Sequence, residues 1–200
     1  MTTEKLLVKQ KIILAAIACI EQNGIQNLTV RDIAQTAGVN VAAINYYFGS
    51  KAKLLDATLR MTMDEAFLET EELLHDPNAD PYLALKGFLE NTIWGSMNSP
   101  GVTKAHLFNP IYDRDKNNYA FVRIEEFMRL LVDRLATKGN KKERKRIRFA
   151  IVQMISAVVM VGLIPELFEQ AVGTDFHKAK IQKDFVAQLM EQSLGNKISS

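Results

Sequence analysis

Apolar residues recur at spacings of three and four along most of the chain, which is the period of an amphipathic helix. In the first segment they are Ile13, Ala16, Ile17 and Ile20. Gly24 follows them and can adopt the left-handed conformation that ends a helix. No run alternates between apolar and polar residues in the manner of a strand. The pattern predicts an all-α fold.

Prolines and glycines divide this pattern into separate predicted helices. We expect them at Glu4–Gln22, Thr29–Thr36, Val41–Tyr47, from the Ser50 cap toward Leu74, Tyr82–Asn98, near Val102–Phe108, Tyr119–Lys138, Lys141–Ile164 and Phe176–Leu194. The segment "NPIYDRDKNN" between two of them is predicted to be a loop.

Two of the predicted helices are short and carry cap residues at their starts. Thr29 is placed as the N-cap of the first, and Asp32 three residues later completes a capping box. Gly38 permits a sharp turn, and Asn40 caps the second short helix. Two short helices joined by a glycine-containing turn form a candidate helix-turn-helix motif.

The second short helix has the residues that reading DNA requires. In a helix-turn-helix its first turns face the bases of the major groove. Val41 or Ala42 can contact a thymine methyl group, and Asn45 can hydrogen-bond to adenine. Tyr46 and Tyr47 end the helix with hydroxyl groups suited to phosphate oxygens.

Lys51 lies in the first turn of the next helix, just after the Ser50 cap. A cation there is disfavoured by the helix dipole. The position makes sense if Lys51 and free backbone N–H groups hold one phosphate together. The alternative is that the tyrosines edge the core and that Lys51 is simply solvated.

The stretch from Gly24 through "LTVRDIAQTAGVN" to "INYYFGSKAKLL" resembles the N-terminal domain of the TetR family of transcriptional repressors. The resemblance covers roughly residues 12–55. It implies a homodimer, a palindromic operator, and release by a small ligand bound in an all-helical C-terminal domain. It also places Thr29 at a phosphate and Arg31 near a base or a phosphate.

One departure from the family pattern concerns the bases that are read. Many members carry Ser-Lys-Gly or Ser-x-Gly where this chain has Asn40, Val41 and Ala42. The apolar start favours methyl contacts and an operator that contains A·T pairs. The candidate DNA-binding residues are Thr29, Arg31, Asn40, Val41, Ala42, Asn45, Tyr46, Tyr47 and Lys51.

Charge is modest, with a formal net value of +2 over 200 residues, so no global basic field announces nucleic acid. Lys5, Lys9 and Lys11 near the chain start either supply extra phosphate contacts or form a solvated face.

The single cysteine, Cys19, excludes a disulfide within the chain. Its apolar surroundings favour a buried thiol over a reactive one.

We expect a DNA-binding domain over residues 1–56 and a ligand-binding and dimerisation domain over 57–200. The apolar segment Phe149–Pro165 is too short to span a membrane and is expected in a core or a subunit interface. The chain start lacks the cleavage site of a signal peptide, which favours the cytoplasm.

The last two long helices, Lys141–Ile164 and Phe176–Leu194, are expected to form the dimer interface. Two such helices from each subunit would form a four-helix bundle through Ile155, Val159, Leu163, Phe185 and Leu189.

Aromatic and methionine side chains gather in the middle of the chain, where few charges interrupt them. Most are expected in the core, but some are candidates for an apolar ligand pocket. The pocket candidates are Phe88, Trp94, Met97, His106, Phe108, Tyr112 and Met154. His106 is either a polar anchor for the ligand or a satisfied core histidine.

No catalytic constellation accompanies these features. The three histidines are scattered without metal-ligand spacing, and no glycine-rich phosphate loop or nucleophile elbow is present. We therefore expect no metal and no cofactor. Two alternatives to a ligand-responsive repressor stay open: a constitutive or architectural DNA-binding protein, and an enzyme built on a helical bundle.

Overall fold

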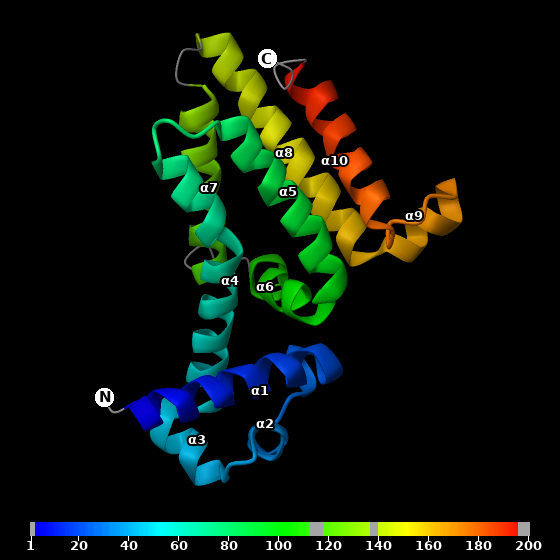
Figure 1. The fold of residues 1–200 in the computed structure, drawn as a ribbon. Helices are drawn as coiled ribbons and strands as arrows, with labels where there is room; N and C mark the ends of the chain where they lie inside the picture. Colours follow the sequence, from blue (N-terminus) through cyan, green and yellow to red (C-terminus); the bar gives the residue numbers. More distant parts are fainter. Residues whose placement is uncertain (1–2, 113–117, 137–139, 196–200) are drawn as a thin grey trace. The chain divides into compact units, whose positions relative to one another are not determined.

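The computed structural model describes residues 3–112, 118–136 and 140–195 of the chain. Within these residues every regular element is an α-helix, as expected (Figure 1). The helices are α1 Thr3–Asn27, α2 Val30–Ala37, α3 Val41–Phe48, α4 Lys51–His75, α5 Pro81–Asn98, α6 Pro100–Tyr112, α7 Tyr119–Leu135, α8 Lys141–Leu163, α9 Pro165–Val172 and α10 Ala179–Leu194.

The helix bounds agree with the expected ones to within a few residues, and α6 extends to Tyr112, into the segment predicted to be a loop. Gly24, with a φ of 73° and a ψ of 153°, interrupts the first helix where the sequence places its end, and helical residues resume beyond it up to Asn27. α8 ends just before Pro165, as expected, but Pro165 is also the first residue of a helix that the sequence analysis does not predict, α9. Proline suits that position because its fixed φ is helical and its missing N–H would have no helical partner there.

The chain forms two compact units. The N-terminal unit comprises residues 1–64 and 101–120, and the C-terminal unit comprises residues 65–100 and 121–200. Most of α6 therefore belongs to the N-terminal unit, although it follows α5 of the other unit in sequence. The domain boundary expected at residue 56 stays a prediction.

The core of the N-terminal unit joins α1, α2, α3, α4 and α6. Its apolar side chains include Ile20, Ile33, Ile44 and Leu54, all fully buried. Cys19 is also buried there, with its Sγ 3.3 Å from Thr36 Oγ1. One continuous core of this kind holds short helices that would not be stable alone.

α6 is attached to α1 at a close approach. The Glu21 carboxylate accepts hydrogen bonds from the backbone N–H groups of Gly101, at 2.9 Å, and Val102, at 2.7 Å. A Cβ atom on Gly101 would lie only 2.8 Å from Glu21 Cα and from the carbonyl oxygen of Ile20. Glu21 thus caps the start of α6, and Gly101 makes room for α1.

The C-terminal unit is built around α5, α8 and α10. Phe127 is stacked on Phe67 with ring centroids 4.5 Å apart, and its centroid lies 4.4 Å from that of Phe88. Arg123 pairs with Glu71 through two hydrogen bonds of 2.9 Å. These contacts fill the interior with aromatic rings and leave the charges at its edge.

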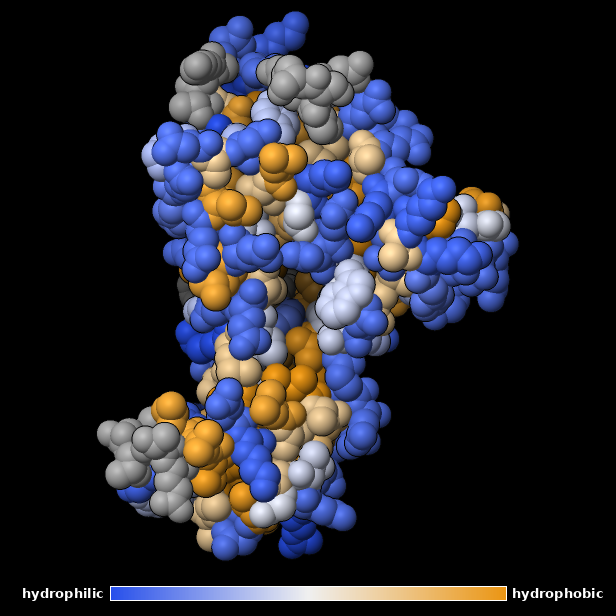
Figure 2. Space-filling view, viewed as in Figure 1, coloured by the Kyte–Doolittle hydropathy of each residue, from blue (hydrophilic) through white to orange (hydrophobic). Residues whose placement is uncertain are grey.

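Apolar surface is exposed on both units. Figure 2 shows it along α1, where Leu6, Leu7 and Leu14 are more than half exposed. In the C-terminal unit α8 is, by length and composition, the one helix of the described residues apolar enough to cross a membrane. Only 39% of its most apolar window is buried, so α8 retains an apolar face that its own unit does not cover.

Gly162 of α8 generates a stability prediction, because a Cβ atom there would lie 2.4 Å from Ser96 Cβ on α5. We expect Gly162→Ala to lower the free energy of unfolding by about 1–3 kcal/mol through overpacking. Gly87→Ala is the control, since nothing lies within 4 Å of its added methyl group. It should raise stability by up to about 1 kcal/mol. Urea denaturation measures both, and equal midpoints for the two variants would contradict the close packing of α5 on α8.

Candidate nucleic-acid interface

The start of α2 is held by a complete capping box. Thr29 Oγ1 accepts a hydrogen bond from the Asp32 N–H at 3.2 Å, and Asp32 Oδ2 accepts from the Thr29 N–H at 2.9 Å. The Thr29 hydroxyl also donates to Asp32 Oδ2 at 2.6 Å. These bonds, with a smaller contribution from Lys51, hold the pKa of the Asp32 carboxyl below its usual value. The predicted capping box is present, and exposed Arg31 follows it.

The turn between α2 and α3 is set by two residues. Gly38 adopts the left-handed conformation, with φ 59° and ψ 40°, and ends α2. Asn40 then caps α3, its Oδ1 accepting a hydrogen bond from the Ala43 N–H at 2.7 Å. Asn40 therefore orients the start of α3, and its amide NH₂ group is the part that can donate to DNA.

One side of α3 is buried and the other is open. Ile44 is fully buried and Phe48 is 7% exposed, whereas Val41, Ala42 and Asn45 are exposed. The three residues predicted to read bases thus share the exposed side of one helix. Small side chains at its first turn permit close approach to base edges.

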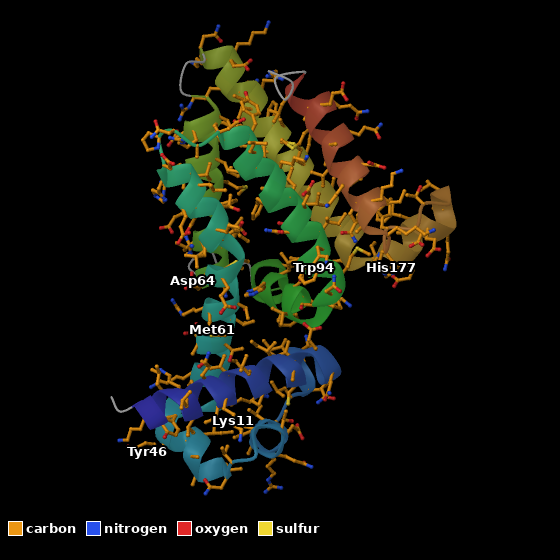
Figure 3. The ribbon with its side chains drawn as sticks, in the orientation of Figure 1. Lys11, Tyr46, Met61, Asp64, Trp94 and His177 are labelled. Carbon is orange, nitrogen blue, oxygen red and sulfur yellow. The ribbon has the colours of Figure 1, made fainter. Side chains whose placement is uncertain are left out.

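The tyrosines at the end of α3 differ in exposure. Tyr46 is 69% exposed, and Tyr47 is half-buried against the core with its ring perpendicular to that of Tyr46. Lys5 Nζ donates a hydrogen bond to Tyr46 Oη at 3.1 Å, which raises the pKa of Lys5. Figure 3 shows Tyr46 of α3 near the start of α1. Lys5 of α1 therefore lies beside Tyr46, one of the predicted phosphate contacts.

The start of α4 completes the interface. Ser50 Oγ accepts a hydrogen bond from the Lys53 N–H at 3.2 Å, as its predicted cap role requires. Lys51 is the first residue of α4 and is half-buried. Backbone N–H groups of a first helical turn, together with an adjacent ammonium group, suit a phosphate. Tyr46 and Tyr47 lie in the last turn of α3, and Lys51 follows three residues after its end. The predicted phosphate contacts are thus next to the predicted base contacts in the chain.

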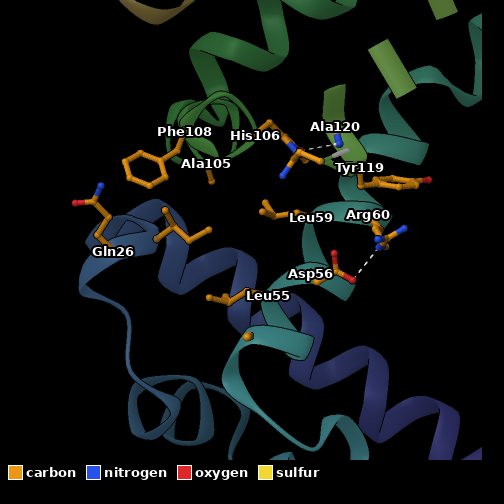
Figure 4. Close-up of a pocket in the computed structure, with 13 residues that line it drawn as sticks. Gln26, Leu55, Asp56, Leu59, Arg60, Ala105, His106, Phe108, Tyr119 and Ala120 are labelled. Atoms are coloured by element: carbon orange, nitrogen blue, oxygen red, sulfur yellow. Dashed lines mark hydrogen bonds and ion pairs between the residues drawn. The ribbon is translucent and has the colours of Figure 1, made fainter. Parts of the chain in front are cut away.

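The residues predicted to line a ligand pocket divide between the two units. Phe88 and Met154 are buried in the C-terminal unit, where Trp94 is 58% exposed. Met97 Sδ accepts a hydrogen bond from Gln182 at 3.4 Å. The side chain of Tyr112 lies outside the described residues. His106 and Phe108 belong instead to the N-terminal unit, where both line a cavity (Figure 4).

The residues predicted at a subunit interface lie on α8 and α10 of the C-terminal unit. All of them are half-buried: Ile155, Val159, Leu163, Phe185 and Leu189. Phe149, Val152 and Met160 of α8 are more than half exposed. The predicted interface residues of α8 thus stand among exposed apolar side chains of the same helix.

The fold and the exposed side of α3 define a helix-turn-helix DNA-binding protein. The sequence model described as bacterial regulatory proteins, tetR family, matches residues 12–58. This match confirms, over these residues, the resemblance found in the sequence.

Similarity to individual proteins extends over most of the chain. Over 175 residues it is 26% identical to the nucleoid occlusion factor SlmA of Aliivibrio fischeri strain MJ11, covering 84% of this chain and 85% of that protein. A TetR-like transcriptional regulator from Rhodococcus sp. RHA1 has a similar fold, with a TM-score of 0.65, 16% identity, and 95% and 97% of the two chains covered. So has FadR of Bacillus subtilis in complex with stearoyl-CoA, with a TM-score of 0.61, 18% identity, and 93% and 98% covered.

Lys51 generates the first prediction about DNA. We expect Lys51→Ala to weaken binding by a similar factor on all sequences and to reduce the slope of log K against log salt by about 1, because a phosphate contact carries no base information. Lys183→Ala, at an exposed position of α10, is the charge-matched control. Fluorescence anisotropy at several salt concentrations measures both. An unchanged slope in Lys51→Ala would exclude the phosphate contact.

Base reading gives a separate prediction. Asn45→Ala and Ala42→Ser should each change which base pair is preferred at one operator position, at about 1–3 kcal/mol per contact. Lys183→Ala, at an exposed position of α10, should leave the preferences unchanged. Binding to a panel of operators with single base changes measures this. If both α3 variants rank the panel as the wild type does, α3 does not read these positions.

Proposed function

We propose that this protein is a ligand-responsive transcriptional repressor that binds a palindromic operator as a homodimer and is released by a small apolar molecule. One observation carries the proposal: the exposed side of α3, followed at once by Tyr46 and Lys51. In helix-turn-helix proteins it is the exposed side of the second helix that enters the major groove. In this role the protein acts in the cytoplasm, where its DNA is, and performs no catalysis.

The homodimer is supported by the energetics of reading a short site. A helix of eight residues touches only a few base pairs, which gives little selectivity over the rest of a genome. Two copies related by a two-fold axis double the contacts, and such dimers are the commonest oligomers. The half-buried apolar residues of α8 and α10, with exposed Val152 beside them, supply a surface that pairing would cover.

Ligand control is supported by a cavity of about 330 Å³ and by the stearoyl-CoA complex of FadR, which has the same fold. The cavity lies at the lower end of the range for small-molecule sites. A constitutive DNA-binding protein would need no such space. Repression is the simplest consequence, because a bound dimer covers its operator.

Selection of bound duplexes from random DNA tests the proposal. The wild type should enrich an inverted repeat whose half-sites lie about one helical turn apart. Val159→Asp and Leu189→Asp should sediment as monomers and lose this enrichment, because a buried unpaired charge opposes pairing.

Ala187→Asp, exposed on a different side of α10, is the control and should stay dimeric. Circular dichroism of all variants shows whether the helices remain folded. A wild-type protein that sediments as a monomer at micromolar concentration, yet enriches a single half-site, would overturn the homodimer.

A further inference from the structure

The cavity lies wholly within the N-terminal unit. Helices α1, α4 and α6 supply most of its wall, and the start of α7 closes one side (Figure 4). Its apolar wall includes Leu55, Leu59, Ala105 and Phe108. His106 is a polar group among them. A space of about 330 Å³ with an apolar wall and a few polar groups, among them Gln26, His106 and Asn118, has the composition of a small-molecule site.

The hydrogen bonds around His106 determine what the anchor offers. Thr62 Oγ1 lies 3.0 Å from His106 Nε2 and 3.2 Å from the carbonyl oxygens of Thr58 and Leu59. We assign the single hydroxyl proton of Thr62 to one of these carbonyls, so that Thr62 Oγ1 accepts from His106 Nε2–H. Burial lowers the pKa of His106 to about 4, so the ring is neutral at pH 7. Nδ1 then carries no proton and can accept a hydrogen bond from a ligand that offers a donor.

The charges that line the cavity already compensate one another. Arg60 Nε and Asp56 Oδ2 are 2.8 Å apart, and the Arg60 guanidinium lies 4.2 Å from the centre of the Tyr119 ring. The two charges cancel, so the cavity has no net charge to offset the hydration that a charged ligand would lose on entering it. The lining therefore favours a neutral molecule.

The walls of the cavity belong to the helices that hold α3. α1 provides Ile25 and Gln26, and α4 provides Leu55 and Leu59. α6 is tied to α1 through Glu21, at the hydrogen bonds to Gly101 and Val102. A molecule that binds better to one spacing of these helices changes the population of that spacing, and with it the affinity for DNA.

We propose that this cavity is the effector site and that it takes a neutral, predominantly apolar molecule with one hydrogen-bond donor directed at His106 Nδ1. The proposal rests on the ligand control proposed above and places the ligand in the N-terminal unit. It differs from the pocket expected from the sequence, which included Phe88, Trp94 and Met154 of the C-terminal unit.

N-phenyl-1-naphthylamine is a suitable probe, because it is neutral, has one N–H donor, and fluoresces more strongly in apolar surroundings. Titration should show saturable binding to the wild type. Leu59→Trp fills the cavity and should weaken binding at least tenfold. His106→Phe keeps the ring but removes the acceptor, and should weaken it about 2–10-fold, the range of one hydrogen bond. Leu83→Trp, at a position 62% exposed on α5, is the matched control and should bind as the wild type does.

A second probe keeps the test independent of variant folding. In 1-phenoxynaphthalene an ether oxygen replaces the N–H group, so it should compete with N-phenyl-1-naphthylamine for the wild type about 2–10-fold more weakly than a donor-bearing analogue. Equal competition would overturn the assignment of His106 as the acceptor. Undiminished probe binding by folded Leu59→Trp would overturn the cavity as the site.

The effect on DNA completes the test. A saturating probe should reduce the affinity of the wild type for its selected operator by about 5–150-fold, the usual range of coupling between sites. In Leu59→Trp the affinity with and without probe should be the same. Selective DNA binding that the probe leaves unchanged in the wild type would overturn this inference alone. Failure to select any sequence would instead overturn the proposed function.

Discussion

The burial of Ile44 and Phe48 is the contact on which the interface depends. α3 has only eight residues, and a helix of that length is unstable in water by itself. Burying each of these side chains contributes about 1.5–3 kcal/mol, which holds α3 in the core of the N-terminal unit. Because the rotation per residue is fixed, this burial also determines that Ala42 and Asn45 are open. Packing of one side of α3 thus determines which side is available for the proposed contact with DNA.

The ends of α3 are controlled by backbone chemistry rather than by packing. Gly38 turns the chain in a conformation that costs other residues energy, and Asn40 satisfies an N–H group of the first turn. At the other end Ser50 starts α4 almost at once. Little chain is left to flex between α2 and α4. The tyrosines and Lys51 therefore follow α3 at a set distance, as groups that contact a regular duplex backbone must.

Local chemistry explains which parts of the structure could be predicted from the sequence. The capping box at Thr29, the turn at Gly38 and the caps at Asn40 and Ser50 depend on neighbours within a few residues, and the sequence displays them directly. α9 was missed because proline both ends one helix and begins another, and Pro165 was interpreted only in the first way.

Contacts between distant segments could not be read in the same way. The hydrogen bond from Lys5 to Tyr46 joins residues 41 positions apart, and that from Gly101 to Glu21 joins residues 80 positions apart. Neither hydrogen bond can be predicted from the periodicity or the spacing of residues in the sequence. For the same reason His106 was grouped with Trp94, its near neighbour in sequence, although the two residues belong to different units. The candidate DNA-binding residues were accessible to sequence reasoning because they lie on consecutive short elements, while the cavity required the fold.

α6 connects these two kinds of information. Val102 packs in the core that carries α2 and α3, His106 and Phe108 line the cavity, and Ala105 contributes to both. One helix thus contacts both the core of the proposed DNA reader and the proposed effector site. Coupling between them needs no long chain of intermediates, because a shift of α6 changes the packing against α1 directly. Glu21 makes that shift costly, since moving α6 away would leave two backbone N–H groups and a carboxylate without their partners. The same contact that completes the fold therefore limits how α6 can respond: it must move with α1, and α1 carries the core in which α3 is set.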